Sequence, residues 1–109
     1  MRIWLVTVGD PIPLDQARPM RVMQAAEQAL ARGHEVTLWA PSFDHYRKRQ
    51  RVSQDTEVQV GPNYRVMVLR SWGYARNVSL RRYLAHWHFG GRLAAAFRRS
   101  RTKPDIVIV

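Results

Sequence analysis

Two titratable side chains stand next to each other in a stretch that is rich in cations. Asp44 and His45 are followed by the basic run 47–51, and aromatic residues flank the pair. A carboxylate beside an imidazole can carry acid–base chemistry or hold a hydroxyl-rich ligand. Because neighbouring residues often point in different directions, we expect ligand contact by this loop rather than direct catalysis by His45.

Two further polar stretches hold candidate substrate-binding residues. Gly9 and Asp10 directly follow the first apolar run of the chain. The stretch 71–77 combines aromatic residues and a glycine with Arg76 and Asn77. All of these are residues that we expect to contact a substrate, and no residue of the chain is predicted to be catalytic.

A strand, a helix and a second strand must position the first two stretches. The apolar run that ends at Val8 is typical of a buried strand, and Glu35 to Trp39 predict another. Between them, apolar residues recur at helical spacing from about Pro19, and Gly33 is the expected stop. This order predicts parallel strands, whose carboxyl ends meet at the edge of the sheet where ligands bind.

The second half of the chain predicts a β excursion, a long helix and a last strand. Residues 57–60 and 64–69 are strand-like around a turn at 61–63, so we expect an excursion over about 52–70. A helical pattern runs from about 78 to 101, and 106–109 predict a strand buried on both faces. The expected fold class is α/β, an open parallel sheet with flanking helices plus this excursion.

The long helix carries three different faces. One is apolar, one is basic, and one is aromatic. The apolar face holds Leu80, Leu84, Trp87, Gly91 and Ala94 with Tyr83 at its edge, the basic face Arg81, His88, Arg92 and Arg99, and the aromatic face Phe89, Leu93 and Phe97. We expect the aromatic face to pack against protein, with insertion into anionic lipid as the alternative. Gly90 and Gly91 predict close packing or a bend.

Composition limits the chain to one modest domain, and its charge suggests an anionic partner, with a merely solvated, arginine-rich surface as the alternative. It has 109 residues, 46% of them hydrophobic, and no cysteine, which excludes disulfides and thiolate metal sites. The formal net charge is +10, and sixteen of the eighteen basic residues are arginine. Nucleic acid, an anionic membrane surface and phosphorylated substrates are the partner classes that this charge favours. No signal peptide or membrane-spanning segment is visible in the sequence.

Several well-known catalytic motifs do not occur. There is no Gly-x-Gly-x-x-Gly after the first strand, no Gly-Lys-Ser/Thr loop and no Gly-x-Ser-x-Gly elbow. His86 and His88 are two residues apart, so they face different ways on a helix and predict no zinc site. We therefore expect a ligand-binding architecture with no metal, no cofactor and no complete catalytic set.

Five segments, in order, resemble one enzyme family. The opening Met1-Arg2-Ile3-Trp4-Leu5-Val6, the stretch 27–37 with its Arg-Gly-His-Glu-Val pattern, and Lys103-Pro104-Asp105-Ile106-Val107-Ile108-Val109 look like the N-terminal domain of GT-B glycosyltransferases of the retaining family 4 type. The stretches 42–49 and 73–82 resemble a bacterial subgroup of that family.

The resemblance implies a two-domain, Rossmann-like enzyme of bacterial polysaccharide biosynthesis. Such an enzyme transfers a sugar from a nucleotide-sugar donor to a glycan or lipid-linked acceptor. Residues 1–109 would form an incomplete N-terminal, acceptor-side domain, inactive alone, with the donor-binding domain and its carboxylate pair beyond Val109. Gly9, Asp10 and Arg21 would approach the donor phosphates or the acceptor. Many relatives have paired glycines before the first helix, where this chain has 16–21 with two arginines.

The resemblance also implies a cytoplasmic protein with peripheral contact to the inner face of the cell membrane. Two other hypotheses about the function of the chain remain open. One is a basic nucleic-acid-binding module, for which no recognition signature is present, so nucleic acid is not the expected partner. The other is a different GT-B-type nucleotide-sugar enzyme, such as an epimerase.

Overall fold

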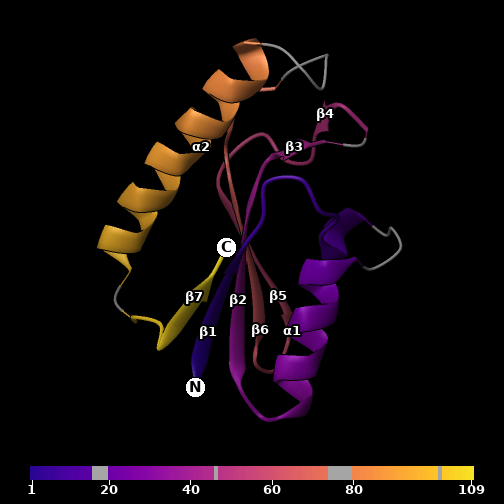
Figure 1. Cartoon of the computed structure of the whole chain (residues 1–109), viewed down its shortest axis with the longest axis vertical. Helices are drawn as coiled ribbons and strands as arrows, with labels where there is room; N and C mark the ends of the chain where they lie inside the picture. The colour runs from indigo at the N-terminus through magenta and orange to yellow at the C-terminus, as the bar shows by residue number, and fades with distance from the viewer. Residues whose placement is uncertain (16–19, 46, 74–79, 101) are drawn as a thin grey trace.

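A mostly parallel sheet of five strands lies between two helices in the computed structural model of the chain, which describes residues 1–15, 20–45, 47–73, 80–100 and 102–109 (Figure 1). The elements in chain order are β1 (Arg2–Val6), a 3-10 turn η1 (Pro13–Asp15), α1 (Arg21–Ala31), β2 (Glu35–Pro41), β3 (Phe43–Asp44), β4 (Arg49–Gln50), β5 (Thr56–Gly61), β6 (Tyr64–Leu69), α2 (Leu80–Arg99) and β7 (Ile106–Ile108).

The sheet has the strand order β5-β6-β2-β1-β7. β1 pairs in parallel with both β2 and β7, and β2 pairs in parallel with β6. The helices cover opposite faces of the sheet (Figure 1). The predicted parallel βαβ unit at the start of the chain is confirmed.

The segment predicted as a β excursion is instead part of the main sheet. β6 is an inner strand, parallel to β2, and only β5 runs antiparallel, at the edge. Val66 and Val68 are fully buried, because one face of β6 lies in the core under α1. Local alternation and a turn indicate a hairpin but cannot show which other strand a hairpin strand joins.

The core on the α1 side is mostly aliphatic, with Tyr64 as an aromatic member. An apolar stripe of α1 (Val22, Ala26, Ala29, Leu30) packs on inward side chains of β1, β2 and β6. Gly33 adopts φ +85°, a left-handed conformation that terminates the helix as expected. The Gly33 N–H donates to the Leu30 carbonyl at 3.0 Å, and His34 N–H donates to Ala29 at 3.1 Å.

The core on the α2 side is aromatic. Trp4 and Trp39 lie side by side on β1 and β2, and the Phe97 ring contacts both, with centroid distances of 4.6 and 5.0 Å. Phe89 is buried in the same cluster and Leu93 packs against it. The aromatic face of α2 therefore packs against protein, as expected. None of the described helices meets the length and apolarity that crossing a membrane would require.

The two central glycines of α2 do not make the close contact that we predicted. A Cβ atom added to Gly90 or Gly91 would meet nothing within 4 Å, because this side of the helix faces solvent. The helix continues through both residues to Arg99.

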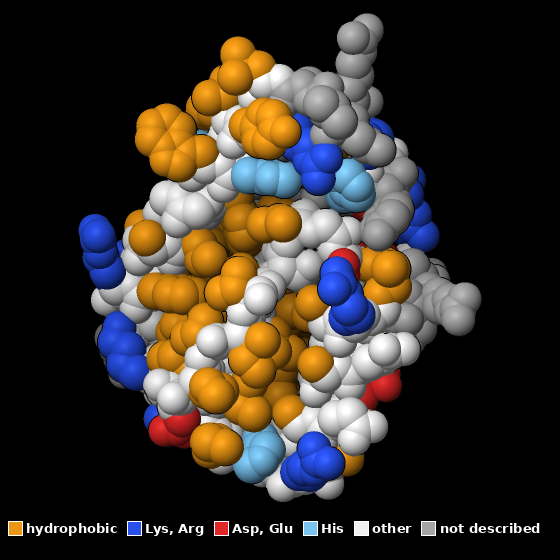
Figure 2. Space-filling model, in the orientation of Figure 1, with side chains coloured by type: hydrophobic (Ala, Val, Ile, Leu, Met, Phe, Trp, Pro, Cys, Tyr) orange, Lys and Arg blue, Asp and Glu red, His pale blue; other side chains and the backbone are white. Residues whose placement is uncertain are grey.

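The prediction that 106–109 are buried on both faces is wrong. Ile106, Val107 and Ile108 are each between two-fifths and one-half exposed. β7 pairs with β1 along one edge, and no strand among the described residues pairs with its other edge. Figure 2 shows the resulting apolar strip between the two helices. An apolar run indicates a strand, but its burial depends on neighbours that the run does not specify.

Replacing Gly33 by alanine is expected to lower the free energy of unfolding by about 1–2 kcal/mol, because L residues are strained at positive φ. Gly90→Ala is the matched control in the helix interior, and it should raise the free energy of unfolding by up to about 1 kcal/mol. Urea unfolding of both variants checks the signs. Equal effects of the two substitutions would contradict this account of the helix end.

Candidate functional site

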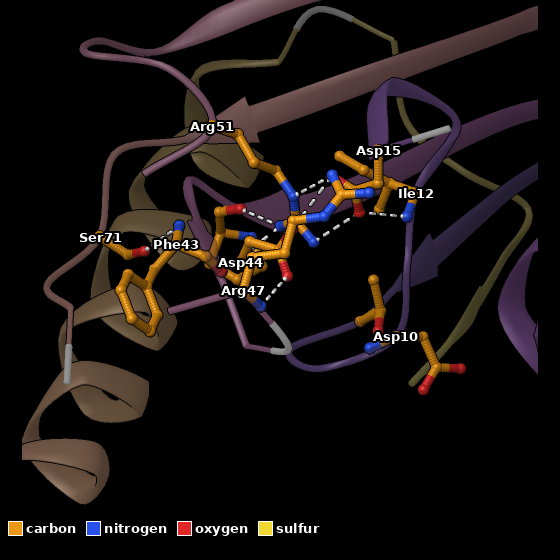
Figure 3. A network of polar contacts seen from close by, with 10 residues as sticks. Asp10, Ile12, Asp15, Phe43, Asp44, Arg47, Arg51 and Ser71 are labelled. Carbon is orange, nitrogen blue, oxygen red and sulfur yellow. Dashed lines mark hydrogen bonds and ion pairs between the residues drawn. The ribbon is translucent and has the colours of Figure 1, made fainter. Parts of the chain in front are cut away.

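The loops after β1, β2 and β6 meet at the carboxyl edge of the sheet, as the parallel pairing predicts. A close view shows their polar contacts (Figure 3). The loop after β2 folds into a short hairpin of β3 and β4, which the sequence patterns did not indicate. Among the described residues, two hydrogen-bonded groups connect the three loops and fix their relative positions.

A buried ion pair joins the first loop to the hairpin. Arg51 donates to the Asp15 carboxylate through Nε at 2.7 Å and through a terminal nitrogen at 2.9 Å. Asp15 also accepts the Ile12 N–H at 2.9 Å, and Arg51 donates to the Pro41 carbonyl at 2.8 Å. Both charged side chains are less than a tenth exposed. Neither residue was among those predicted to form the site, because no local pattern relates positions thirty-six apart.

A serine pair joins the loop after β2 to the loop after β6. The Ser71 N–H donates to Ser42 Oγ at 2.9 Å, and Ser42 Oγ donates to Gln50 Oε1 at 2.6 Å. Gln50 Nε2 in turn donates to the Ser71 carbonyl at 3.1 Å. Gly73 lies directly on the Phe43 ring, where a Cβ would be only 2.8 Å away. This packing leaves no room for a side chain at Gly73.

Three of the predicted substrate-binding residues line one pocket. A cavity of about 480 Å³ lies at the carboxyl ends of β1 and β7, beside the first turn of α1, and its lining includes Gly9, Asp10 and Arg21. The Asp10 N–H donates to Thr7 Oγ1 at 3.1 Å. The Asp10 carboxylate points away from the Asp15–Arg51 pair (Figure 3). Thr7 was not among the predicted substrate-binding residues, because it lies within the apolar run that ends at Val8.

Asp44 shapes the hairpin. It is buried, its carboxylate accepts the Arg47 N–H at 3.2 Å, and a guanidinium nitrogen of Arg47 lies 3.9 Å away. Its carbonyl accepts the Lys48 N–H at 2.8 Å, and Lys48 adopts φ 53° in the turn. Neither Asp44 nor His45 lines the pocket beside α1.

His45 belongs to a cationic group that includes α2. Burial lowers the pKa of His45 below its ordinary value of 6.5, and the charges of Lys48, Arg82 and His86 lower it further. Burial and the Arg82 charge likewise lower the pKa of His86. Both imidazoles are therefore predominantly neutral at pH 7 and can accept a hydrogen bond or a proton. Arg76 and Asn77, the remaining predicted residues, lie outside the described part of the chain.

Among the described residues, no group of three or more histidine, cysteine, aspartate or glutamate side chains is placed to hold a metal ion. Comparisons of the chain with protein-family models, with curated proteins and with solved structures gave no match. The site is therefore interpreted from its own geometry.

Removing the Arg51 guanidinium is expected to lower the free energy of unfolding by about 3–5 kcal/mol, because it leaves the Asp15 carboxylate buried without its cation. The matched control is Arg2→Leu, which breaks the exposed Arg2–Glu35 pair and should cost less than about 1 kcal/mol. Denaturant unfolding of Arg51→Leu and Arg2→Leu measures both. Similar losses in the two variants would contradict a structural role for the buried pair.

Arg82→Gln is expected to raise the pKa of both His45 and His86, because the Arg82 charge disfavours protonation of each ring. Arg92→Gln is the control and should instead raise the pKa of His88, which lies near that arginine. The chemical shift of each imidazole Cε1–H, followed by NMR against pH, gives the three values. An unchanged His45 pKa in Arg82→Gln would show that this loop does not face α2.

Since the folded-state pKa of these histidines is lowered, the unfolded chain binds protons more readily. Above pH 6.5 both histidines are mostly neutral in the folded and in the unfolded chain, and their contribution to the free energy of unfolding is fully present. As the pH falls from there towards the folded pKa, the unfolded chain takes up protons first, so the free energy of unfolding declines.

Proposed function

We propose that this chain forms the acceptor-side, N-terminal domain of a glycosyltransferase. The whole enzyme would transfer a sugar from a nucleotide-sugar donor to a glycan or lipid-linked acceptor, with the donor-binding domain and the catalytic carboxylates supplied by a second domain. The observation that carries the proposal is the pocket at the carboxyl ends of β1 and β7, where Gly9, Asp10 and Arg21 come together.

The strand order supports a Rossmann-like domain of the GT-B type. β6, β2, β1 and β7 are parallel neighbours, and helices cover both faces of the sheet. In open sheets of this kind, ligands bind outside the carboxyl ends of the strands, where the strand order reverses. Here the chain runs from β1 outward to β2 and β6 and then returns to β7 on the other side of β1, with α1 and α2 on opposite faces (Figure 1), so the order reverses between β1 and β7.

The start of α1 is suited to an anionic group such as a phosphate. The first N–H groups of a helix lack intrahelical partners, and here the preceding Met20 supplies no side-chain cap. Arg21 opens the helix, although a cation at this end is unfavourable by about 0.3–1 kcal/mol. A bound phosphate would reverse that effect and use the guanidinium as a second donor.

The other lining residues suit the uncharged part of a sugar nucleotide or an acceptor. Asp10 offers a carboxylate that can accept hydrogen bonds from hydroxyl groups. Gly9 has no Cβ, and open space surrounds that position, so a ligand can approach the backbone there. In this proposal, Asp10 orients the acceptor and Arg21 holds phosphate.

Nucleic-acid binding has weaker support from the same molecule. Its motivation is the net charge of +10 and the interleaved aromatic residues. Trp4 and Trp39, however, are buried under α2, so the sheet face is not available for stacking bases.

Arg21→Ala is expected to weaken binding of nucleotide sugars by at least about tenfold, because a charge-assisted hydrogen bond to phosphate is lost. Calorimetric titration of the chain with UDP-glucose and GDP-mannose measures this. Arg32→Ala, which removes an exposed arginine at the other end of α1, should leave the affinity unchanged.

NMR shifts upon titration should map to residues 5–10 and 21–25. Equal affinity of both arginine variants, or shifts confined to other residues, would refute the proposed site. Tighter binding to a mixed-sequence oligonucleotide than to either nucleotide sugar would favour the nucleic-acid alternative.

A further inference from the structure

The outer face of α2 is an apolar surface without a protein partner among the described residues. Leu80, Tyr83 and Trp87 are 74%, 64% and 80% exposed, and Leu84 is more than a third exposed. These residues follow one another at helical spacing of three and four, so they form one continuous ridge. Scattered exposed apolar residues are ordinary, but a contiguous ridge of this kind marks an interaction surface.

The orientation of α2 is fixed by its opposite face. Phe89 and Phe97 are held in the aromatic cluster on the sheet, which turns the ridge outward. Figure 2 shows apolar side chains gathered over the upper end of the molecule, where α2 begins. Hiding the ridge within this domain would require the helix to rotate and expose that cluster instead.

Trp72 extends the ridge beyond the helix. Its ring stacks on His88 at a centroid distance of 4.3 Å, and the Arg81 guanidinium lies 5.7 Å from the ring centre. Arg81 also donates to the Gly73 carbonyl at 2.9 Å, which ties the helix start to this loop. A groove of about 590 Å³ separates Trp72 from Trp87 on the solvent side.

The charge on α2 has a single sign. The helix contains five arginines and no acidic residue: Arg81, Arg82, Arg92, Arg98 and Arg99. Arg92 forms an ion pair with Asp55. Arg81 and Arg99 are five helical turns apart, so they lie along the same flank of the ridge. Arg98 lies in line with the ridge itself.

We infer that the outer face of α2 binds the surface of an anionic lipid membrane. Leucine with tryptophan and tyrosine is the composition of a helix that lies in the interface, with aromatic rings at the level of the headgroups. The arginines beside it provide charge complementarity to anionic lipid. A second copy of this chain is a poorer occupant, because two helices without acidic residues would be brought together.

In this arrangement α2 lies flat on the bilayer, with Leu80 and Trp87 at the boundary between headgroups and acyl chains. The groove between Trp72 and Trp87 is open to receive part of a lipid chain. The inference does not depend on the proposed glycosyl transfer, because none of these residues lines the pocket beside α1.

Flotation of the chain with vesicles tests the inference. The protein should float with an equimolar mixture of phosphatidylcholine and phosphatidylglycerol, and much less with phosphatidylcholine alone. Trp87→Gln should lower the partition coefficient by at least about tenfold, because a large exposed apolar side chain no longer enters the interface. Val60→Gln, which replaces an exposed apolar side chain on β5, is the matched control and should bind as the unchanged chain does.

Because Trp87 is exposed, its replacement should leave the far-ultraviolet circular dichroism spectrum, which reports secondary structure, unchanged. Equal flotation of Trp87→Gln and the unchanged chain would overturn the inference, and so would equal binding to the two kinds of vesicle. A dimer in light scattering that Trp87→Gln dissociates, without vesicle binding, would assign the ridge to a second copy instead.

Discussion

Parallel pairing of β1 with β2 and β7 is the constraint on which the rest of this structure depends. Two parallel strands cannot be joined by a tight turn, so each connection must run back along one face of the sheet before the next strand begins. α1 makes this return on one face and α2 on the other (Figure 1). As a consequence, the loops after β1, β2 and β6 all emerge at one edge, and polar residues distant in the sequence become neighbours there.

Lying at one edge of the sheet does not by itself fix the loops relative to one another. The buried polar contacts between the loops do so. The Asp15–Arg51 pair holds the first loop against the β3–β4 hairpin, and the Ser42–Ser71 contact holds the hairpin against the loop after β6. Each contact includes a further hydrogen bond nearby in the chain: Asp15 also accepts the Ile12 N–H, and Ser42 Oγ also donates to Gln50. Such pairs favour one arrangement of the loops, since removing one member leaves the other buried without its partner from the neighbouring loop.

The two helices illustrate different uses of an amphipathic pattern. α1 has one apolar stripe, which is used in the core, and its N-terminus opens the pocket at the carboxyl edge. α2 has apolar residues on two faces, and the sheet can cover only one of them. The aromatic face is the one buried because Phe89 and Phe97 match the Trp4 and Trp39 surface of the sheet. The remaining ridge and the arginines beside it face outward together.

Local patterns in the sequence determined the elements of this protein. The apolar run before Gly9, the helical spacing from Val22 to Leu30 and the left-handed position of Gly33 each depend on near neighbours, so the first βαβ unit was predictable. Because Gly9 and Asp10 directly follow the first strand of that unit, their place at the edge where ligands bind was predictable too. Only the tertiary structure decided that β6 is an inner strand, that β7 is exposed and that Arg51 meets Asp15. These outcomes depend on contacts between residues far apart in the chain, and one sequence contains no local signal for them.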